Sequence, residues 1–376
     1  MGSRGKNPSQ KTIMQLCARS AGRCQFEGCN KNLFIEGLTL KRGYFGNIAH
    51  NVASSPEGPR GDKVTSSMLS DDVDNLLLLC HEHHKLVDDN PEEFTEARLR
   101  EMKQKHEKMI ASHCDLIWKE SSEVLRFLSP IKGTHSVSIN LQQAIEAIIP
   151  SFRPASERGL IISIQPLCEY NTPEYWQQAD NDLTSKVKLV VGSIQNDNPN
   201  QHFSIFPIGP IPLIAKLGYL LGDKIRCEVY QKSRVPDTWK WISEEQTNHF
   251  FVQKNTIREG NRVALILSLT DLINESRVTG VFNADTIYKI SAEHTGVSCL
   301  KSETDLAEFW NTYQAVCNEI TNTYPDVNEI AVFPAVPVSA AFSIGYRYMP
   351  GVYPKMTIYE ENNGFVKTIS FGGNGL

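Results

Sequence analysis

The spacing of hydrophobic residues in this 376-residue chain changes near residue 159. From there to the C-terminus, short apolar runs of the kind buried in parallel sheets alternate with helical stretches. This alternation predicts an α/β fold with largely parallel strands. The expected strands cover residues 160–164, 186–191, 203–206, 225–230, 263–268, 329–333 and 355–359.

The first 120 residues have a different pattern, in which short helices and strands are separated by glycine and proline. A helix is expected over 11–21, and a longer one starts at Asn90 and runs to about 119. The apolar residues of the longer helix follow three-four spacing, which predicts packing against its own domain, the next domain or another helix. We therefore expect a domain over 1–120, a connecting region with one amphipathic helix over 121–158, and a second domain over 159–376.

The C-terminal half contains an internal repeat. Residues 206–219 align without gaps on residues 333–346, and each copy begins with Phe-Pro, ends with Gly-Tyr and precedes a further strand. Two copies of one strand–turn–helix unit predict two lobes related by pseudo-two-fold symmetry, at about 159–260 and 261–376. A crevice is expected at the strand ends, where open α/β sheets bind ligands.

Composition and charge narrow the class of protein. The content of 40% apolar and 22% charged residues is ordinary for a globular protein. No run of eighteen apolar residues or signal peptide is present, so we expect a cytoplasmic protein without membrane contact. The net charge is −5, but residues 1–66 hold ten lysines and arginines against four acids, a local excess that attracts phosphate.

Two pairs of residues have the spacing of zinc ligands. Cys24-x4-Cys29 and Cys80-x2-His83 together supply a Cys3His set, which is typical of a structural zinc site. The other six cysteines are scattered without paired spacing, and we expect them to be reduced. This set leaves His50, Asn75 and His84 unused, and we expect the remaining histidine of the cluster, His81, to be exposed.

His50, Asn75 and His84 occur in an order that resembles the HNH (ββα-metal) nucleases. The matching elements are Cys-x4-Cys, Ile48-Ala49-His50, Gly58-Pro59-Arg60-Gly61 and the stretch from Asn75 to His84, so the resemblance covers about residues 12–90. It implies an α+β domain in which His50 is the general base and Asn75 holds the loop that carries His50. It also implies that His84 binds Mg²⁺ or a similar ion.

Two residue assignments in this domain have alternatives. Arg60 is expected either to contact a DNA phosphate or to be a solvated loop arginine. HNH enzymes often carry an aspartate before the first histidine as a second metal ligand, and this chain has Ala49 there. The candidates for the second ligand are Asp62 and Asp74.

The repeated half, next to such a nuclease module, resembles a SAVED domain, in which two CARF-like (Rossmann-like) lobes sense cyclic oligonucleotides in bacterial CBASS antiphage systems. The whole chain thus resembles an HNH-SAVED effector. This implies an endonuclease that degrades double-stranded DNA as a dimer or tetramer after a cyclic di- or trinucleotide binds. Side chains that stack on the bases and groups that bind the phosphates are expected at strand ends. The candidates are Tyr170, Trp176, Pro207, Thr270 and Pro334, with Lys216 and Arg347 for the phosphates.

Two other functions fit parts of the sequence. The first is an HNH restriction endonuclease whose C-terminal half recognises DNA sequence or modification, although residues 160–376 contain no basic run. The second is a non-catalytic, zinc-stabilised DNA-binding regulator with a small-molecule sensor. That function does not explain why His50, Asn75 and His84 occur in addition to four zinc ligands.

Overall fold

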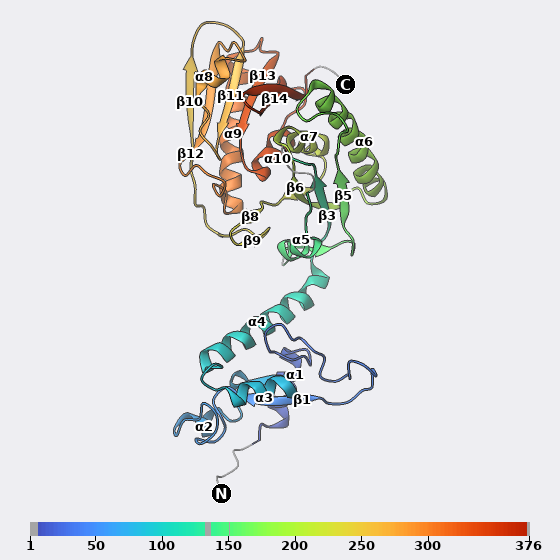
Figure 1. The fold of residues 1–376 in the computed structure, drawn as a ribbon, viewed down its shortest axis with the longest axis vertical. Helices are drawn as coiled ribbons and strands as arrows, with labels where there is room; N and C mark the ends of the chain where they lie inside the picture. Colours follow the sequence, from blue (N-terminus) through green and yellow to red (C-terminus); the bar gives the residue numbers. More distant parts are fainter. Residues whose placement is uncertain (1–6, 132–136, 150, 374–376) are drawn as a thin grey trace. The chain divides into compact units, whose positions relative to one another are not determined.

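The computed structural model describes residues 7–131, 137–149 and 151–373 (Figure 1). Two compact units are present: an N-terminal unit, Met1–Trp118, and a C-terminal unit, Lys119–Leu376. Among the described residues, no helix is both long enough and apolar enough to cross a membrane.

The N-terminal unit is built around a two-stranded antiparallel sheet. Its strands, β1 and β2, pair so that His50 lies opposite Leu76 and Gly46 opposite Cys80. All four leucines of β2 are fully buried, and the helix α3 follows this strand without a break. The elements are α1 (Gln10–Arg19), β1 (Gly46–His50), α2 (Thr65–Leu69), η1 (Val73–Asn75), β2 (Leu76–Cys80), α3 (His81–Asp89), α4 (Glu96–Asp115) and η2 (Leu116–Trp118).

The long helix α4 begins later than the sequence predicted. Thr95 is its N-cap and accepts a hydrogen bond from the Arg98 backbone, whereas Asn90 ends α3 and donates to the Leu86 carbonyl. The first part of the apolar face is buried in its own unit, and the second part is exposed. This confirms packing within the domain for the buried residues Leu99, Met102 and His106 and leaves Met109, His113 and Ile117 exposed.

The C-terminal unit contains two large sheets and the two-stranded antiparallel sheet β8-β9. In the first, all pairings are parallel, the order is β4-β3-β6-β7, and β5 also pairs with β3. In the second, the order is β10-β12-β11-β13-β14-β15, with four parallel strands between two antiparallel edge strands. The strands are β3 (Ser121–Leu128), β4 (Arg153–Pro154), β5 (Leu160–Ser163), β6 (His202–Ile208), β7 (Cys227–Val229), β8 (Ser233–Arg234), β9 (Asp237–Thr238), β10 (Phe250–Thr256), β11 (Val263–Ser268), β12 (Thr286–Ala292), β13 (Glu329–Ala335), β14 (Lys355–Glu361) and β15 (Phe365–Phe371).

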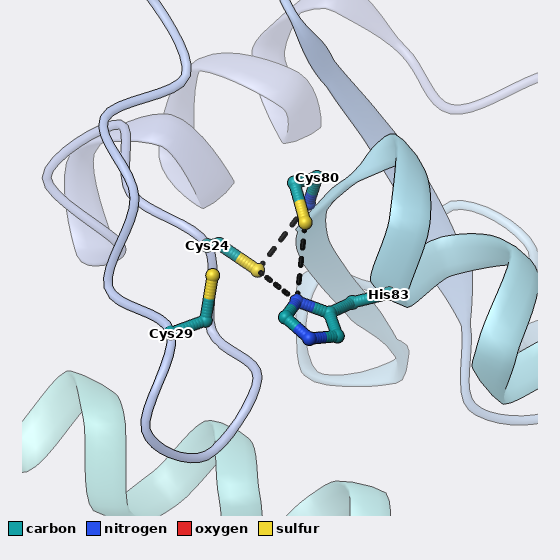
Figure 2. Close-up of side chains that lie close together, drawn as sticks. All are labelled: Cys24, Cys29, Cys80 and His83. Atoms are coloured by element: carbon teal, nitrogen blue, oxygen red, sulfur yellow. Dashed lines mark hydrogen bonds between the residues drawn. The ribbon is translucent and has the colours of Figure 1, made fainter. Parts of the chain in front are cut away.

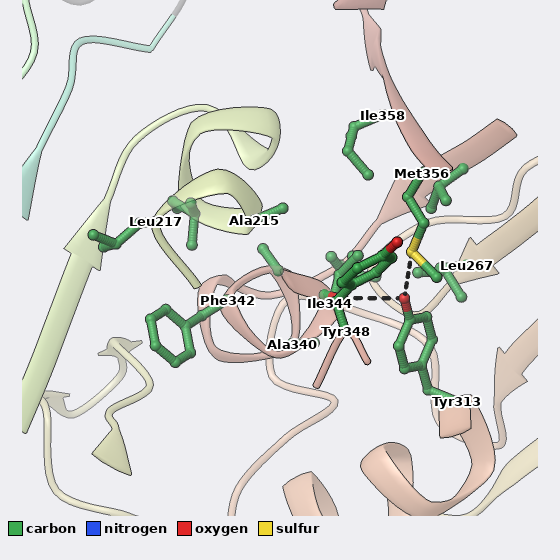
Figure 3. Packing of buried hydrophobic residues seen from close by; sticks show 14 of the residues in the cluster. Ala215, Leu217, Leu267, Tyr313, Ala340, Phe342, Ile344, Tyr348, Met356 and Ile358 are labelled. Carbon is green, nitrogen blue, oxygen red and sulfur yellow. Dashed lines mark hydrogen bonds between the residues drawn. The ribbon is translucent and has the colours of Figure 1, made fainter. Parts of the chain in front are cut away.

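Helices cover both faces of the second sheet, and a shared core joins the two sheets. Leu265 and Leu267 of β11 face this core, whereas Ala264 and Ile266 face a separate cluster that includes Val278 of α8. Strands buried on both faces in this way read as continuous apolar runs. Figure 3 shows the core around Tyr313, whose hydroxyl donates to the Ile344 carbonyl. The helices are α5 (Leu141–Ile148), α6 (Pro173–Asp197), α7 (Ile211–Leu221), α8 (Glu275–Thr279), α9 (Glu303–Thr323) and α10 (Val338–Tyr346).

The two copies of the repeat meet where α7 crosses α10. A Cβ atom on Gly218 would lie 2.1 Å from the Phe342 carbonyl oxygen, and one on Gly345 would lie 1.9 Å from the Ala215 carbonyl oxygen. Both distances are far below contact separation, so only glycine fits at either position. Gly218 and Gly345 occupy the same place in the repeat, as do Ala215 and Phe342. The crossing therefore has the internal pseudo-two-fold symmetry that the repeat predicted.

Several boundaries differ from those expected. The segment 186–191 belongs to α6, not to a strand, because Leu183, Val187 and Val191 are buried one helical turn apart. The region 121–158 was expected to connect the domains, but its strand β3 lies inside the first sheet and pairs with β6. The first sheet thus begins at Ser121 and the second at Phe250, both before the expected lobe boundaries. The other expected strands are confirmed.

We predict that Gly345→Ala destabilises the C-terminal unit by about 3 kcal/mol or more, because backbone atoms at the helix crossing would have to move. The matched control is Gly192→Ala in α6, where a Cβ would meet nothing within 4 Å. The control should stabilise the unit by about 0.5–1 kcal/mol, since alanine is the better helix former. Urea and thermal unfolding measure both changes, and equal midpoints would contradict the role of the crossing.

Candidate functional site

The four expected zinc ligands lie together in the N-terminal unit. Cys24, Cys29, Cys80 and His83 each direct one ligand atom to a common point, and all four atoms lie within 4.8 Å of one another (Figure 2). The His83 Nδ1 atom is 3.1 Å from the Cys80 sulfur and 3.7 Å from the Cys24 sulfur. Tetrahedral zinc would hold such atoms roughly 3.5–3.8 Å apart. The cluster therefore has the composition and size of a structural zinc site.

Local structure positions each ligand. Gly28 has a φ of +80°, which lets the chain turn between Cys24 and Cys29. Gln25 is buried, and its side-chain oxygen accepts from the Leu78 backbone, which joins this turn to β2. The His83 ring stacks on Phe26 with centroids 4.0 Å apart.

The electrostatics of the cluster also favour a cation. Burial raises the pKa of the Cys24 thiol to about 12, and the nearby Cys29 and Cys80 add to this effect. Burial likewise raises the pKa of Cys80. Three thiols this close cannot ionise together without a positive charge between them. A bound zinc ion supplies that charge, so the residues present fit the metal.

His50 lies at the end of β1 with one ring nitrogen already engaged. Its Nε2 is 3.2 Å from the Ser70 carbonyl oxygen. A carbonyl oxygen only accepts, so Nε2 carries the hydrogen and Nδ1 remains able to take a proton. Burial lowers the pKa of His50, while the Ser70 carbonyl and the Asp88 carboxylate oppose this shift. The imidazole is therefore neutral, as a base must be, over a wider pH range.

Asn75 and Arg60 hold the segment that follows His50. Asn75 is buried; its amide donates to the Val52 carbonyl at 2.9 Å and accepts from the Val52 backbone at 2.9 Å. This is a backbone contact of the kind that the resemblance to HNH nucleases implied for Asn75. The Arg60 guanidinium donates to the carbonyls of Asn51, Val87 and His50, at 2.8, 3.1 and 3.3 Å. Its side chain is only 7% exposed, so the expectation of a solvated loop arginine was wrong, while contact with a DNA phosphate stays a prediction.

An acid other than those expected lies beside His84. Asp88 is one helical turn further along α3, and its carboxylate is 3.6 Å from the His84 Nδ1 and 3.4 Å from the Arg60 guanidinium. The expected second ligands are engaged elsewhere: Asp62 accepts from the backbone of Val64 and Thr65, and Asp74 pairs with Arg19 at 2.5 Å. The pair His84 and Asp88 supplies one imidazole and one carboxylate, a set suited to a divalent ion. His81 is exposed, as expected.

The C-terminal unit has a cavity of about 490 Å³ near the carboxyl ends of β6, β11 and β13. Its walls are mainly apolar, and the described residues that line it include four basic side chains and no acid. Lys232 is paired with Asp237, whereas Arg234, Lys240 and Lys301 make no ion pair with any described residue. The lining residues are Ile131, Ile208, Gln231, Lys232, Ser233, Arg234, Lys240, Trp241, Ile242, Thr270, Val297, Ser298, Leu300, Lys301, Val336, Pro337 and Val338.

Of the seven residues expected to contact a nucleotide, only Thr270 lines this cavity. Pro207 and Pro334 are buried within β6 and β13, just before residues that do line it. Trp176 is in the core at 3% exposed, and Tyr170 packs on it. The two expected phosphate partners are engaged elsewhere: Lys216 pairs with Asp180 at 3.0 Å, and the Arg347 guanidinium lies 4.1 Å from the centre of the Trp310 ring.

The sequence analysis missed the residues that give the cavity its charge. Lys232, Arg234, Lys240 and Trp241 fall within one short segment in which basic and aromatic residues alternate. That alternation is a signal for nucleotide binding and could have identified them. Lys301 carries no such local signal, because the fold alone brings it to the same cavity.

This parallel architecture with a strand-end cavity defines the C-terminal unit as an α/β ligand-binding unit of two linked lobes. The sequence profile of the SAVED family, described as the "SMODS-associated and fused to various effectors sensor domain", matches residues 170–371. This is more than half of the chain, and the protein belongs to the SAVED family. β3 and β5 lie before the matched region, although both pair within the first sheet.

Solved structures of SAVED/CARF-domain receptors are similar in fold at low identity. Acinetobacter baumannii Cap4 with the cyclic trinucleotide 2'3'3'-cAAA is 11% identical, with a TM-score of 0.45 over 82% of this chain and 66% of that one. The same receptor with 3'3'3'-cAAA is 11% identical, with a TM-score of 0.46 over 83% of this chain and 67% of that one. Moraxella osloensis Cap4 is 11% identical, with a TM-score of 0.40 over 77% of this chain and 60% of that one. The chain thus spans about two thirds or less of their length. A comparison with curated proteins finds no match.

We predict that purified protein contains about one zinc ion per chain and that Cys29→Ser removes most of it. Because a structural zinc of this kind contributes roughly 10–16 kcal/mol of apparent folding free energy, the N-terminal unit of the variant should lose protease resistance. Cys114→Ser is the matched control, since Cys114 is an exposed thiol of α4 in the same unit. Metal analysis and limited proteolysis measure both effects. Full zinc content in Cys29→Ser would contradict the ligand set.

Proposed function

We propose that the protein is an HNH-type endonuclease that degrades double-stranded DNA when a cyclic oligonucleotide binds its SAVED domain, as part of CBASS antiphage defence. The observation that carries the nuclease part is that His50, with Nε2 directed to the Ser70 carbonyl, interacts electrostatically with both members of the His84 and Asp88 pair. The sensor part is supported by the family membership and by the unpaired cations of the strand-end cavity.

The N-terminal unit has the groups that hydrolysis of a phosphodiester requires. His50, free at Nδ1, takes a proton from the attacking water. Asn75 and Arg60 fix the backbone at His50 and in the two residues after it, so the base stays in one place. A divalent ion such as Mg²⁺, held by His84 and Asp88, would stabilise negative charge on the phosphate.

The cavity of the C-terminal unit matches the chemistry of a cyclic oligonucleotide. Trp241 offers a flat surface on which a base stacks, and the apolar wall covers the ribose and base edges. Arg234, Lys240 and Lys301 have charges to pair with phosphates. The Acinetobacter receptor structures hold cyclic trinucleotides, which makes these molecules the first probes to use.

One catalytic unit of this kind cuts one strand, so a break in duplex DNA is most simply made by two units in a homo-oligomer. Ligand binding would then activate the protein by stabilising the assembled form. A dimer and a tetramer both satisfy this requirement.

We predict that His50→Ala and Asp88→Asn each lower the rate of plasmid degradation, the first by about 10²–10⁴-fold because it removes the general base. The measurement is gel analysis of plasmid with Mg²⁺ and the activating cyclic trinucleotide. Zinc content should remain about one per chain in both variants, because neither residue belongs to the zinc set.

The matched controls for this assay are His81→Ala and Asp89→Asn. Each changes an exposed residue of the same type next to the proposed site, and both should cut like the unaltered protein. Unchanged cleavage by His50→Ala would refute its role as the base. Equal losses in Asp88→Asn and Asp89→Asn would refute Asp88 as a metal ligand.

We predict that the protein leaves DNA intact until a cyclic oligonucleotide is added and that the ligand increases the apparent size of the protein in sizing chromatography.

Trp241→Ala should weaken binding of the cyclic oligonucleotide by roughly 5- to 150-fold, because stacking of one base contributes about 1–3 kcal/mol. Thermal shift and calorimetric titration with cyclic di- and trinucleotides measure this change.

Because Trp241 is partly buried, the double variant Arg234→Gln with Lys240→Gln provides a second test at exposed positions. Trp118→Ala is the control, since that tryptophan is 88% exposed in the N-terminal unit. Constitutive, sequence-specific cutting would favour a restriction enzyme. A monomer that cuts after ligand addition would refute activation by assembly.

A further inference from the structure

The segment between the zinc turn and β1 forms a hairpin, residues 34–45, that projects apolar side chains into solvent. Its arms are joined by backbone hydrogen bonds from Glu36 to Lys41, from Gly43 to Phe34 and from Phe45 to Leu33, at 2.8–3.0 Å. Leu38 and Leu40 at the tip are 89% and 73% exposed. Exposed leucines at the end of an ordered hairpin indicate a surface that contacts a partner.

The tip has a defined shape. One oxygen of the Glu36 carboxylate accepts hydrogen bonds from the backbones of Leu38 and Thr39 and from the Thr39 hydroxyl, at 3.0, 2.5 and 2.7 Å. These donors lower the pKa of Glu36, so its carboxylate is ionised and satisfied within the turn. Leu40 has a φ of +55°, a conformation that a flexible loop of L residues rarely keeps. The exposed leucines are therefore presented in one arrangement.

Two cations follow the apolar tip on one arm of the hairpin. Lys41 and Arg42 are exposed, and their side chains make no hydrogen bond or ion pair with any described residue. Glu36 is the one acid in this segment, and its charge is engaged by the turn. The hairpin thus combines an apolar wedge with two free positive charges, a combination found in proteins that insert into the minor groove of DNA.

The hairpin is fixed relative to the proposed catalytic base. Leu33 at its foot is fully buried, and Phe45 at the other foot directly precedes β1, which ends at His50. Four residue-to-residue steps of strand lead from Gly46 to His50, a distance of about 13 Å, or roughly four base pairs of DNA. The foot of the hairpin therefore lies about 13 Å along β1 from His50, and both belong to the same compact unit.

We propose that the 34–45 hairpin binds double-stranded DNA by inserting Leu38 and Leu40 into the minor groove, with Lys41 and Arg42 on the adjacent phosphates. This rests on the proposed nuclease function and identifies the part of the chain that grips the substrate. Inserted leucines partly unstack a base step and bend the duplex. The contacts carry no base-specific hydrogen bonds, which is consistent with cleavage that has little sequence preference.

The test uses the full chain with His50→Ala, which prevents degradation, and a labelled 30-base-pair duplex. The slope of the logarithm of the DNA association constant against the logarithm of the salt concentration is negative. The double variant Lys41→Gln with Arg42→Gln should reduce its magnitude by about two, since two phosphate contacts are lost. Leu38→Ser with Leu40→Asn should leave this slope unchanged but abolish the fluorescence rise of 2-aminopurine that reports unstacking. Asparagine is chosen at position 40 because it tolerates a positive φ.

The matched controls are Lys108→Gln and Met14→Ser, which alter an exposed lysine and an exposed apolar residue of α4 and α1. Both should bind DNA like the parent. The minor-groove ligand netropsin should compete with the parent, and binding that is insensitive to netropsin would overturn insertion in that groove. Loss of binding to phosphatidylserine vesicles in the leucine variant, with DNA binding unchanged, would identify a membrane surface as the partner and overturn the proposal.

Cleavage by the chain with His50 intact separates this proposal from the nuclease proposal. If that chain cuts DNA and the hairpin variants bind and cut equally well, the hairpin proposal fails and the nuclease proposal stands. If the hairpin variants weaken binding but the chain never cuts DNA, the hairpin proposal stands and the nuclease proposal fails.

Discussion

The close crossing of α7 and α10 is the constraint on which the C-terminal unit depends. At this point backbone lies directly on backbone, since neither Gly218 nor Gly345 has room for a Cβ atom. Each helix starts at the carboxyl end of a strand, α7 after β6 and α10 after β13. A crossing fixed by two glycines thus fixes how the ends of these two strands face each other. The cavity lined by Ile208 and Val336 lies at those ends.

In the N-terminal unit, the zinc set connects the elements that carry the proposed catalytic groups, as the helix crossing connects the strand ends of the C-terminal unit. It joins the turn at Cys24 to the end of β2 and the first turn of α3. Successive residues of a helix point about 100° apart, so the same turn directs His83 to the zinc cluster and His84 to Asp88. Arg60 then ties the backbone at His50 to the carbonyl of Val87 in the same helix. The arrangement of the proposed catalytic groups therefore depends on α3, and a metal ion bound by the Cys3His set would hold α3 in place.

Local patterns in the sequence predicted the parts of the structure that are locally determined. The four residues of the Cys3His cluster follow from their spacing, and the six confirmed strands follow from short segments rich in apolar residues. The repeat identified both copies of the strand–helix unit, because the symmetric crossing requires the same glycine in each. β3 was missed because Arg126 interrupts its apolar run; in the structure the Arg126 guanidinium donates to the Ile139 carbonyl. Residues 186–191 read equally well as a strand or as one side of a helix, and burial on α6 decided between them.

The site residues that could not be predicted depend on tertiary contacts. Arg60 lies in a loop rich in glycine and proline, where solvent exposure is the normal expectation, yet three backbone carbonyls enclose its guanidinium. Asp88 differs from Asp62 and Asp74 only in facing His84 across one helical turn. The cavity draws its lining from segments as distant as Ile131 and Val338, so no single stretch of sequence describes it.

The charge of the cavity bears on how a sensor of this kind can act as a switch. Arg234, Lys240 and Lys301 line one space without a compensating acid among the described residues that line it, so an anion bound there would lower their mutual repulsion. A ligand shifts an equilibrium by its difference in affinity between two states, not by its affinity alone. Arg234 lies on the small hairpin formed by β8 and β9, and Lys301 lies just before α9. If the proposed ligand draws these two segments together, it binds that arrangement more tightly, and the difference in binding free energy would be available for the proposed activation.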